Sequence, residues 1–298
     1  MTYTKFRITA AGLFMFIALS SGIGRHDVDP AAYRNLAAQK PFECVGRVYK
    51  DSVATASCVL ISERYVLTAA HALLVSDLRK DTVQLNGQTF ILYVPENTRV
   101  AYPSSIYITV NGQQRQIKSM TLHPGYLKNT NKGYCDLALL ELHEPINTVA
   151  AARLYIKDDE MSMFVTGVGY GVTGKADKMD SVAQTDYKTA GNNVVDKISG
   201  PKSEGRKTIL SCDFDAPGIA GCNKMGMASP LPLEYICGGG DSGGGLFKEE
   251  SDGFYLVGIC SGSGTDINQM LKTGYYGQVM DWTRVSAFAK WIHANMKG

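Results

Sequence analysis

Short runs of apolar residues alternate with polar ones along most of the chain, and turn-forming residues separate the runs. Short strands with such turns between them are typical of a sandwich or a barrel. The runs predict strands at 42–50, 57–67, 83–85, 89–94, 106–110, 117–122 and 193–198. Apolar residues recur at helical spacing over 285–296, which predicts a C-terminal helix with Val285, Phe288, Ile292 and Met296 on its packed face.

The first 22 residues have the parts of a secretory signal peptide. Lys5 and Arg7 precede an uncharged run that ends in small residues at Ser20 and Ser21. The run is shorter than the about 20 residues that span a bilayer comfortably, so it favours a cleaved leader over a membrane anchor. We therefore expect secretion, to the extracellular space or to the periplasm of a Gram-negative bacterium, and no membrane attachment after cleavage.

The composition describes a folded protein with a balanced surface. Hydrophobic residues make up 45% and charged residues 19% of the chain. The 30 Lys and Arg residues outnumber the 28 Asp and Glu residues by two, and removal of a leader with Lys5 and Arg7 abolishes that excess. A balanced charge provides no attraction for nucleic acid, so we expect none as a partner.

A glycine-rich stretch over residues 237–246 has the composition of a nucleophile loop around Ser242. Glycines on both sides of Ser242 permit positive φ angles and leave room for a substrate carbonyl. The alternative interpretation is a glycine-rich turn at the surface with no catalytic role. The letters also match Gly-x-Ser-x-Gly, the nucleophile turn of α/β-hydrolases. That fold places Asp and His after the serine, and the 56 residues that follow Ser242 are too few for it. A catalytic base must therefore lie upstream.

Two upstream residues have a suitable setting. His71 follows a buried strand pattern and two alanines, and Asp136 precedes the apolar run at 137–140. A lone buried carboxylate is costly, so Asp136 needs a partner. His71 as an ordinary core histidine and Asp136 as a turn or helix-capping residue are the alternatives.

His71, Asp136 and Ser242, in this order and with these flanks, resemble the chymotrypsin/trypsin-like serine proteases. The resemblance covers about residues 42–296 and includes Gly-Tyr-Gly at 169–171. It implies an all-β fold of two six-stranded antiparallel β-barrels with a C-terminal helix. The first barrel would lie within 23–150, the second barrel and the helix within 151–298, and the site in the cleft between the barrels.

The resemblance also implies an activity and partners. We expect a serine endopeptidase that hydrolyses peptide bonds through an acyl-enzyme, with protein or peptide substrates, protein inhibitors as further partners and no cofactor. A non-catalytic homologue that serves as a binding module is the alternative, together with an esterase on the same fold. All three members of the catalytic triad are present, which favours the peptidase.

Further residues receive roles through the same resemblance. The N–H groups of Gly240 and Ser242 would form the oxyanion hole, and Ser261 would approach Asp136. Ser261, Gly262 and Ser263 would pair with the substrate. The specificity position of trypsin-like members falls on Ile236, or on Tyr235 if the extra glycine before Asp241 is skipped, so we expect a preference for apolar or small side chains.

In animal digestive members a new N-terminus pairs with the aspartate before the serine, here Asp241. Cleavage after Gly22 would expose Ile23, and we expect its ammonium group to pair with Asp241. Cleavage after Ser20 is the rival.

Seven cysteines suit an exported chain. Cys212 with Cys222 would close a short loop, and Cys237 with Cys260 would tie the nucleophile loop to a later strand. Cys44, Cys58 and Cys135 remain, so at least one thiol is free or pairs between chains. We expect no metal, because the sequence has no Cys-x-x-Cys pair and no histidine cluster.

Overall fold

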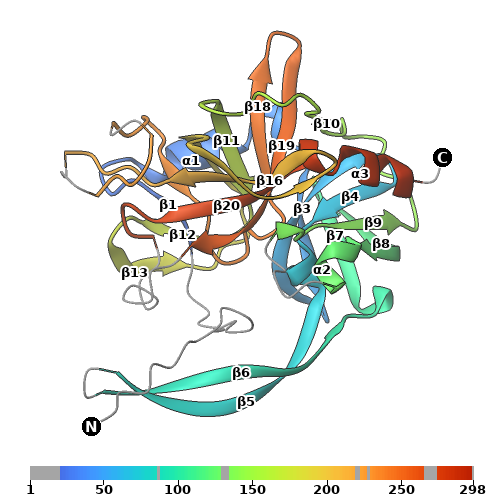
Figure 1. Ribbon diagram of the computed structural model, residues 1–298, viewed down its shortest axis with the longest axis horizontal. Helices are drawn as coiled ribbons and strands as arrows, with labels where there is room; N and C mark the ends of the chain where they lie inside the picture. The colour runs from blue at the N-terminus through green and yellow to red at the C-terminus, as the bar shows by residue number, and fades with distance from the viewer. Residues whose placement is uncertain are drawn as a thin grey trace.

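The computed structural model describes residues 21–85, 88–128, 134–218, 222–226, 229–264 and 274–296. The predicted leader lies outside this part of the chain except for its last two residues. Within it, no helix combines the length and the apolarity needed to cross a membrane. The structure is mostly β, with short helices at the edges (Figure 1).

Six antiparallel strands form a closed barrel in the first half of the chain. In barrel order they are β2 (Val45–Lys50), β3 (Val53–Ser62), β4 (Tyr65–Thr68), β9 (Ala138–Leu142), β8 (Gln113–Leu122) and β7 (Ile106–Val110). Burial alternates along β7, where Ile106, Ile108 and Val110 point into the core. Closure leaves no unpaired sheet edge, which stabilises an arrangement of short strands.

A second sheet curls back on itself in the second half. Its strand order is β14 (Thr189–Val194), β11 (Phe164–Gly169), β18 (Gly245–Glu250), β19 (Gly253–Gly264), β20 (Val279–Arg284), β16 (Arg206–Asp213) and β15 (Lys197–Ser203). β14 and β15 are separated by two residues, and the Asp196 N–H donates to the Ser211 carbonyl at 3.0 Å. The two strands therefore act as one bent strand that pairs on both sides and completes the second barrel. The short β10 (Arg153–Leu154) pairs in parallel with β19.

The predicted strand at 193–198 falls on this bend, so the structure divides it between β14 and β15. Val195 is buried and both neighbouring segments are paired, which is why the sequence pattern looked continuous. The division of the whole chain at residue 150 stays a prediction.

A small four-stranded sheet covers the second barrel. It contains β13 (Lys178–Ala183), β12 (Val172–Lys175), β1 (Ser21–Gly24) and β17 (Tyr235–Ile236) in this order. Helix α1 (Pro30–Ala37) packs beside β14. The N-terminal segment thus lies with the second barrel, although it precedes the first barrel in sequence.

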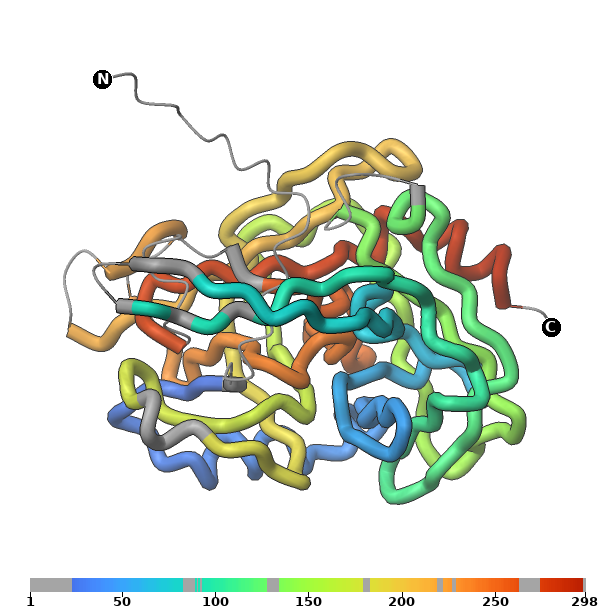
Figure 2. The backbone as a smooth tube through the Cα atoms, turned by 90° about the horizontal axis from the view of Figure 1, so that it is seen from below, coloured from blue at the N-terminus to red at the C-terminus, as the bar shows by residue number. Residues whose placement is uncertain are grey.

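A long hairpin of β5 (Leu74–Leu85) and β6 (Gln88–Val100) projects from the body of the molecule (Figure 1). Seen from below, its two strands run side by side across the front of the view (Figure 2). At its base the Ala101 N–H donates to the Leu73 carbonyl at 2.8 Å. The sequence predicted strands only at its tip, 83–85 and 89–94. Leu78 and Ile91 are about half exposed. Because the hairpin lacks a buried face over much of its described length, the residues near its base do not alternate between apolar and polar, and the sequence pattern did not predict strands there.

The remaining helical segments are short. They are η1 (Lys40–Phe42), η2 (Ala70–Leu73), η3 (Pro103–Ser105), α2 (Pro124–Lys128), η6 (Val285–Ala287) and α3 (Ala289–Asn295). The predicted C-terminal helix is interrupted at Phe288, whose φ of −130° separates η6 from α3. Val285, Phe288 and Ile292 are fully buried against the core of the first barrel, as predicted. The end of the chain therefore returns from the second barrel to the first.

Candidate active site

The structure brings His71, Asp136 and Ser242 together where the two barrels meet. His71 Nδ1 lies 2.6 Å from Asp136 Oδ2, and His71 Nε2 lies 2.8 Å from Ser242 Oγ. His71 belongs to η2 and Asp136 precedes β9, both in the first barrel, whereas Ser242 precedes β18 of the second. The three side chains form one continuous line of hydrogen bonds across the interface.

Asp136 is held by several donors. Its Oδ1 accepts from the His71 backbone N–H at 2.9 Å, and its Oδ2 also accepts from Ser261 Oγ at 2.7 Å. Its carbonyl accepts from Thr283 Oγ1 at 3.0 Å. The bonds to Oδ1 and Oδ2 satisfy the carboxylate of Asp136, a residue that is 3% exposed. Ser261 was expected here, whereas Thr283 was missed, because it lies 147 residues from Asp136 and on a strand of the other barrel.

The pKa of His71 is set by opposing influences. Burial lowers the pKa, whereas the charge of Asp136 and its hydrogen bond raise it, and Lys50 lowers it slightly. The net result is a pKa raised above the ordinary value of a histidine. His71 is therefore a stronger base than a free imidazole.

Glycine is required at two positions of the nucleophile loop. Gly240 has a φ of +92° and Gly243 a φ of +84°, both in the region that favours glycine. A Cβ on Gly243 would also lie 2.2 Å from the Ser57 carbonyl oxygen and 2.2 Å from Thr68 Oγ1. In the described part of the chain, neither the Gly240 N–H nor the Ser242 N–H donates to another protein group. Both are thus available to a ligand, and their role as an oxyanion hole stays a prediction.

Asp241 is buried behind the loop and accepts three hydrogen bonds. Gly171 N–H donates to its Oδ1 at 2.7 Å, and Tyr235 OH and Gly238 N–H each donate to its Oδ2 at 2.8 Å. Burial raises the pKa of Asp241 to about 6, and these donors oppose the rise. A Cβ on Gly169 would lie 2.2 Å from Asp241 Oδ1, which explains the glycine there.

Ile23 lies inside β1, opposite Gly174 of β12 and Ile236 of β17. Ser21 pairs with Val172, the residue after the Gly171 amide that donates to Asp241. Because a strand rises about 3.3 Å per residue, Ile23 is about 7 Å farther along than Ser21. The pairing of an Ile23 ammonium with Asp241 stays a prediction.

Of the predicted substrate-binding residues, Ser261 contacts the proposed triad through Asp136, and the role of the others stays a prediction. Gly262 has open space where a Cβ would stand, and it pairs with Asp281 of β20. Ser263 follows Gly262 in β19, and its side chain lies outside the part of the chain that the structure describes. Ile236 and Tyr235 are 1% and 4% exposed. Ile236 packs in the small sheet beside β1, and the Tyr235 hydroxyl is used by Asp241.

All seven cysteines are unpaired in the structure. The predicted Cys212–Cys222 bridge is not formed: Cys212 is buried in β16 and Cys222 is half-buried in the loop beyond it. The Cys237 and Cys260 thiols hydrogen-bond to one another, so they lie side by side as predicted but without a bond. Within the described ranges, no three His, Cys, Asp or Glu side chains gather to hold a metal ion.

Comparison with known proteins agrees with this geometry. The family model described as Trypsin matches residues 35–292, so the chain belongs to the trypsin family of serine proteases. It is 29% identical over 248 residues to phenoloxidase-activating factor 3 of Holotrichia diomphalia, covering 80% of this chain and 63% of that protein. It is 25% identical over 282 residues to CLIP domain-containing serine protease B10 of Anopheles gambiae, covering 89% of this chain and 64% of that protein. The chain thus spans less than two thirds of the length of these relatives.

Proposed function

We propose that this protein is a serine endopeptidase with His71, Asp136 and Ser242 as its catalytic triad. The observation that carries the proposal is the unbroken line of hydrogen bonds from Asp136 through His71 to Ser242 Oγ. A serine hydroxyl is a weak nucleophile until a base takes its proton. His71 lies within hydrogen-bonding distance of Ser242 Oγ and can act as that base.

In the proposed reaction, Ser242 Oγ forms a bond to the carbonyl carbon of the substrate while its proton passes to His71. The negative charge of Asp136 stabilises the imidazolium. His71 then gives the proton to the amine nitrogen as the carbon–nitrogen bond breaks, which leaves an acyl-enzyme. Water, with its proton removed by His71, attacks the ester, and Ser242 recovers its proton.

The N–H groups of Gly240 and Ser242 are the proposed oxyanion donors. A donor of this kind contributes roughly 3–4 kcal/mol to transition-state stabilisation. Two observations support the proposal: Gly240 has the positive φ of a tight turn, and among the described residues neither amide donates to another protein group.

The substrate is proposed to be a protein or peptide with an apolar or small side chain at the specificity position. Ser261, Gly262 and Ser263 would bind its backbone, and Ile236 and Tyr235 would lie at the base of the pocket. The predicted leader over residues 1–22 supports export to an oxidising compartment, where we propose that the neighbouring Cys237 and Cys260 form a disulfide bond. Protein inhibitors are the further partners that we propose.

Active-site labelling tests this function. One sample of the full chain is treated with a serine-directed phosphonylating reagent and its labelled residue is mapped, and a separate untreated sample is assayed on a panel of peptide amides and on matched esters. We expect labelling at Ser242 and turnover of both substrate types, with both lost in Ser242→Ala and kept in Ser104→Ala, an exposed serine elsewhere. Absence of labelling would favour the binding module, and turnover of esters alone would favour the esterase.

A further inference from the structure

The hairpin of β5 and β6 projects from the edge of the proposed active site. β5 starts at Leu74, three residues after His71, and the hairpin extends under the second barrel (Figure 1). We propose that one face of this hairpin binds the protein substrate at a second contact, away from the scissile bond, through an apolar segment that carries a carboxylate. The inference rests on the proposed peptidase function.

The two faces of the hairpin differ in composition. Successive side chains of a strand point to opposite sides, and residues paired across an antiparallel ladder share a side. Three consecutive pairs on one side form what we call the apolar face: Leu78 with Pro95, Lys80 with Tyr93, and Thr82 with Ile91. These positions are exposed except for Pro95, which is half-buried. Lys80 is the charged member of the set.

The opposite face carries charges that are paired within the hairpin. Arg79 Nη1 lies 3.0 Å from Asp81 Oδ2, and Arg79 Nε donates to Glu96 Oε1 at 2.6 Å. On the same side, Asp77 accepts from Asn97 Nδ2 at 2.9 Å. These polar groups already have partners in the hairpin, so the apolar face is the one that would gain from contact with another molecule.

The apolar face leaves three large side chains in contact with water. Leu78, Ile91 and Tyr93 are 52%, 53% and 45% exposed. Ile91 and Tyr93 are neighbours on one side of β6, and Leu78 lies diagonally across the ladder from Tyr93. The three therefore form one continuous patch. Burial of apolar surface is favourable, and contiguous exposed patches mark interaction sites.

The size of the patch indicates the kind of partner. Three side chains that are about half exposed present roughly 300 Å², less than half of the about 800 Å² per partner that stable protein complexes bury. The patch is thus too small to hold a second copy of this chain or an unrelated protein by itself. It suits a partner that is already bound nearby, because the second contact is then intramolecular. A protein whose scissile segment is held at the proposed active site is such a partner.

The position of the patch separates short substrates from long ones. Leu78 and Thr82 lie four and eight residues beyond Leu74, so at about 3.3 Å per residue the apolar face runs from about 13 to about 26 Å from the start of the hairpin. An extended peptide of four residues spans about 14 Å at most. With its scissile bond at Ser242, such a peptide extends only part of that length to either side and stays short of the apolar face. A longer chain can reach it.

Lys80 adds a charge to the proposed recognition. Its side chain is exposed on the apolar face opposite Tyr93, and none of the ion pairs among the described residues includes it. An ammonium group without an ionic partner favours a carboxylate in the molecule that covers the face. We therefore expect the segment that binds here to combine apolar side chains with Asp or Glu.

Synthetic peptides test the second contact. The reference is the four-residue peptide that the full chain cleaves fastest, with the cleaved bond inside it. Three longer peptides join this sequence, through a Gly-Ser linker of about 12 residues, to a terminal segment that alternates Leu with Glu, Leu with Lys, or Ser with Glu. The linker has an average length of about 20 Å, which matches the position of the patch. Each peptide is made with the segment before and after the cleaved bond.

Two variants of the full chain remove the proposed contacts. Leu78→Ser with Ile91→Ser removes most of the apolar patch, and Lys80→Glu reverses its charge. The matched controls are Ile156→Ser, an isoleucine that is 57% exposed on the connection between the barrels, and Lys40→Glu, an exposed lysine in η1. Circular dichroism verifies that each variant is folded, and kcat and KM are measured for every peptide.

For the unaltered chain, we expect a KM about tenfold lower for the Leu-Glu peptide than for the reference, in at least one of the two placements and with kcat unchanged, because the linker makes the second contact intramolecular. The double serine variant should lose this gain, and Lys80→Glu should prefer the Leu-Lys peptide. The Ser-Glu peptide should gain little. All variants should cleave the reference as the unaltered chain does, since the reference does not reach the apolar face.

Several outcomes would overturn the inference. Equal KM values for the reference and the Leu-Glu peptide, in both placements, would show that no second contact forms. A gain that survives in the double serine variant would place the contact elsewhere, and an equal loss on the reference would show that the hairpin shapes the active site instead. Sedimentation and vesicle flotation test other occupants. Dimerisation, or binding to vesicles of phosphatidylcholine and phosphatidylserine, that is lost in the double serine variant would assign the face to a second copy or to a membrane.

Failure of the proposed function gives a different result. The unaltered chain would then leave the reference peptide intact and would not be labelled at Ser242. Equal KM values with cleavage of the reference intact would refute the second contact alone.

Discussion

Asp136 contributes both charge and orientation to His71. The backbone and ring nitrogens of His71 bind different oxygens of the same carboxylate, and Ser261 binds one of them as well. A neutral amide at position 136 could keep part of this geometry, but it would not stabilise an imidazolium or favour the correct tautomer.

We therefore expect Asp136→Asn to fold and to lose about 10⁴-fold in kcat. Asp136 raises the pKa of His71, and neutral His71 is the active base, so its loss should move the acidic limb of the residual activity to lower pH. The measurement is kcat/KM from pH 4 to 9, with Asp177→Asn, an exposed carboxylate, as the control. An acidic limb that stays in place would contradict this explanation.

The residues of the proposed triad could be picked out from the sequence because each lies in a short motif. The residues that hydrogen-bond to the triad or to the nucleophile loop could not. Ser57, Tyr235 and Thr283 have ordinary strand patterns, and their hydroxyls gain a role only from partners more than 100 residues away or across a turn. The signal available in the sequence was a hydroxyl at an inward position of an apolar strand, which requires a hydrogen-bond partner when buried.

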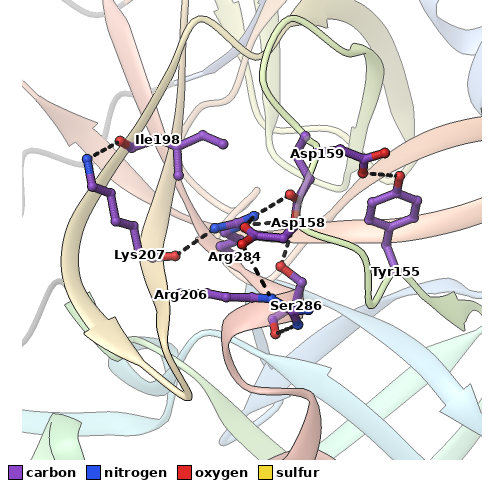
Figure 3. A network of polar contacts seen from close by, with 9 residues as sticks. Tyr155, Asp158, Asp159, Ile198, Arg206, Lys207, Arg284 and Ser286 are labelled. Carbon is purple, nitrogen blue, oxygen red and sulfur yellow. Dashed lines mark hydrogen bonds and ion pairs between the residues drawn. The ribbon is translucent and has the colours of Figure 1, made fainter.

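Four segments meet at Arg284, at the end of β20 (Figure 3). Arg284 Nε donates to Glu160 Oε1 at 2.9 Å, and its Nη2 contacts both Glu160 and Asp158. Ser286 Oγ donates to Glu160 Oε1 at 2.6 Å. Arg206 of β16 donates to the Ser286 carbonyl at 2.9 Å. The network fastens the connection between the barrels to the start of the C-terminal segment.

Glu160 and Arg284 are 0% and 2% exposed, so neither tolerates loss of the other. Arg284→Leu should lower the free energy of unfolding by about 3–5 kcal/mol, because it leaves a buried carboxylate unpaired. The double variant Arg284→Leu with Glu160→Leu should recover most of this loss. Urea denaturation measures both, and a double variant that is no more stable than Arg284→Leu would contradict the argument.

In the first barrel, β2 and β7 were predicted almost in full and β8 in part, whereas β11, β16, β18 and β20 of the second barrel received no individual prediction. Two further differences have physical causes. The projecting hairpin of β5 and β6 lacks a buried face over much of its length, so its base gave no alternation. The bend at Val195 and Asp196 is invisible to a pattern search, because both sides of it are paired strands.

For the protein as a whole, a buried group of carboxylates makes stability depend on pH. Burial raises the pKa of Asp196 to about 6, of Asp215 to about 7 and of Glu234 to about 8, and neighbouring carboxylates add to all three. Unfolded, these groups have a pKa near 4. The folded state therefore binds protons more tightly, and stability is lost as pH rises through the folded pKa values.

The melting temperature should accordingly fall between pH 5 and pH 8.5. In the double variant Asp196→Asn with Asp215→Asn the fall should be smaller, because two of the titrating groups are gone. Differential scanning calorimetry at constant ionic strength checks both curves. A melting temperature that rises over this range in the unaltered protein would contradict the assignment.

The strands of the first barrel, the C-terminal amphipathic segment and the three residues of the proposed triad could be recognised from the order of residues, because alternation and short motifs are local properties. The partners of Asp241, the hydrogen bond from Ser57 to the Gly240 carbonyl and the unpaired state of the cysteines depend on which distant segments become neighbours. Hydrogen bonds and buried charges act over a few ångströms in space, and the chain brings those atoms together only when both barrels have closed.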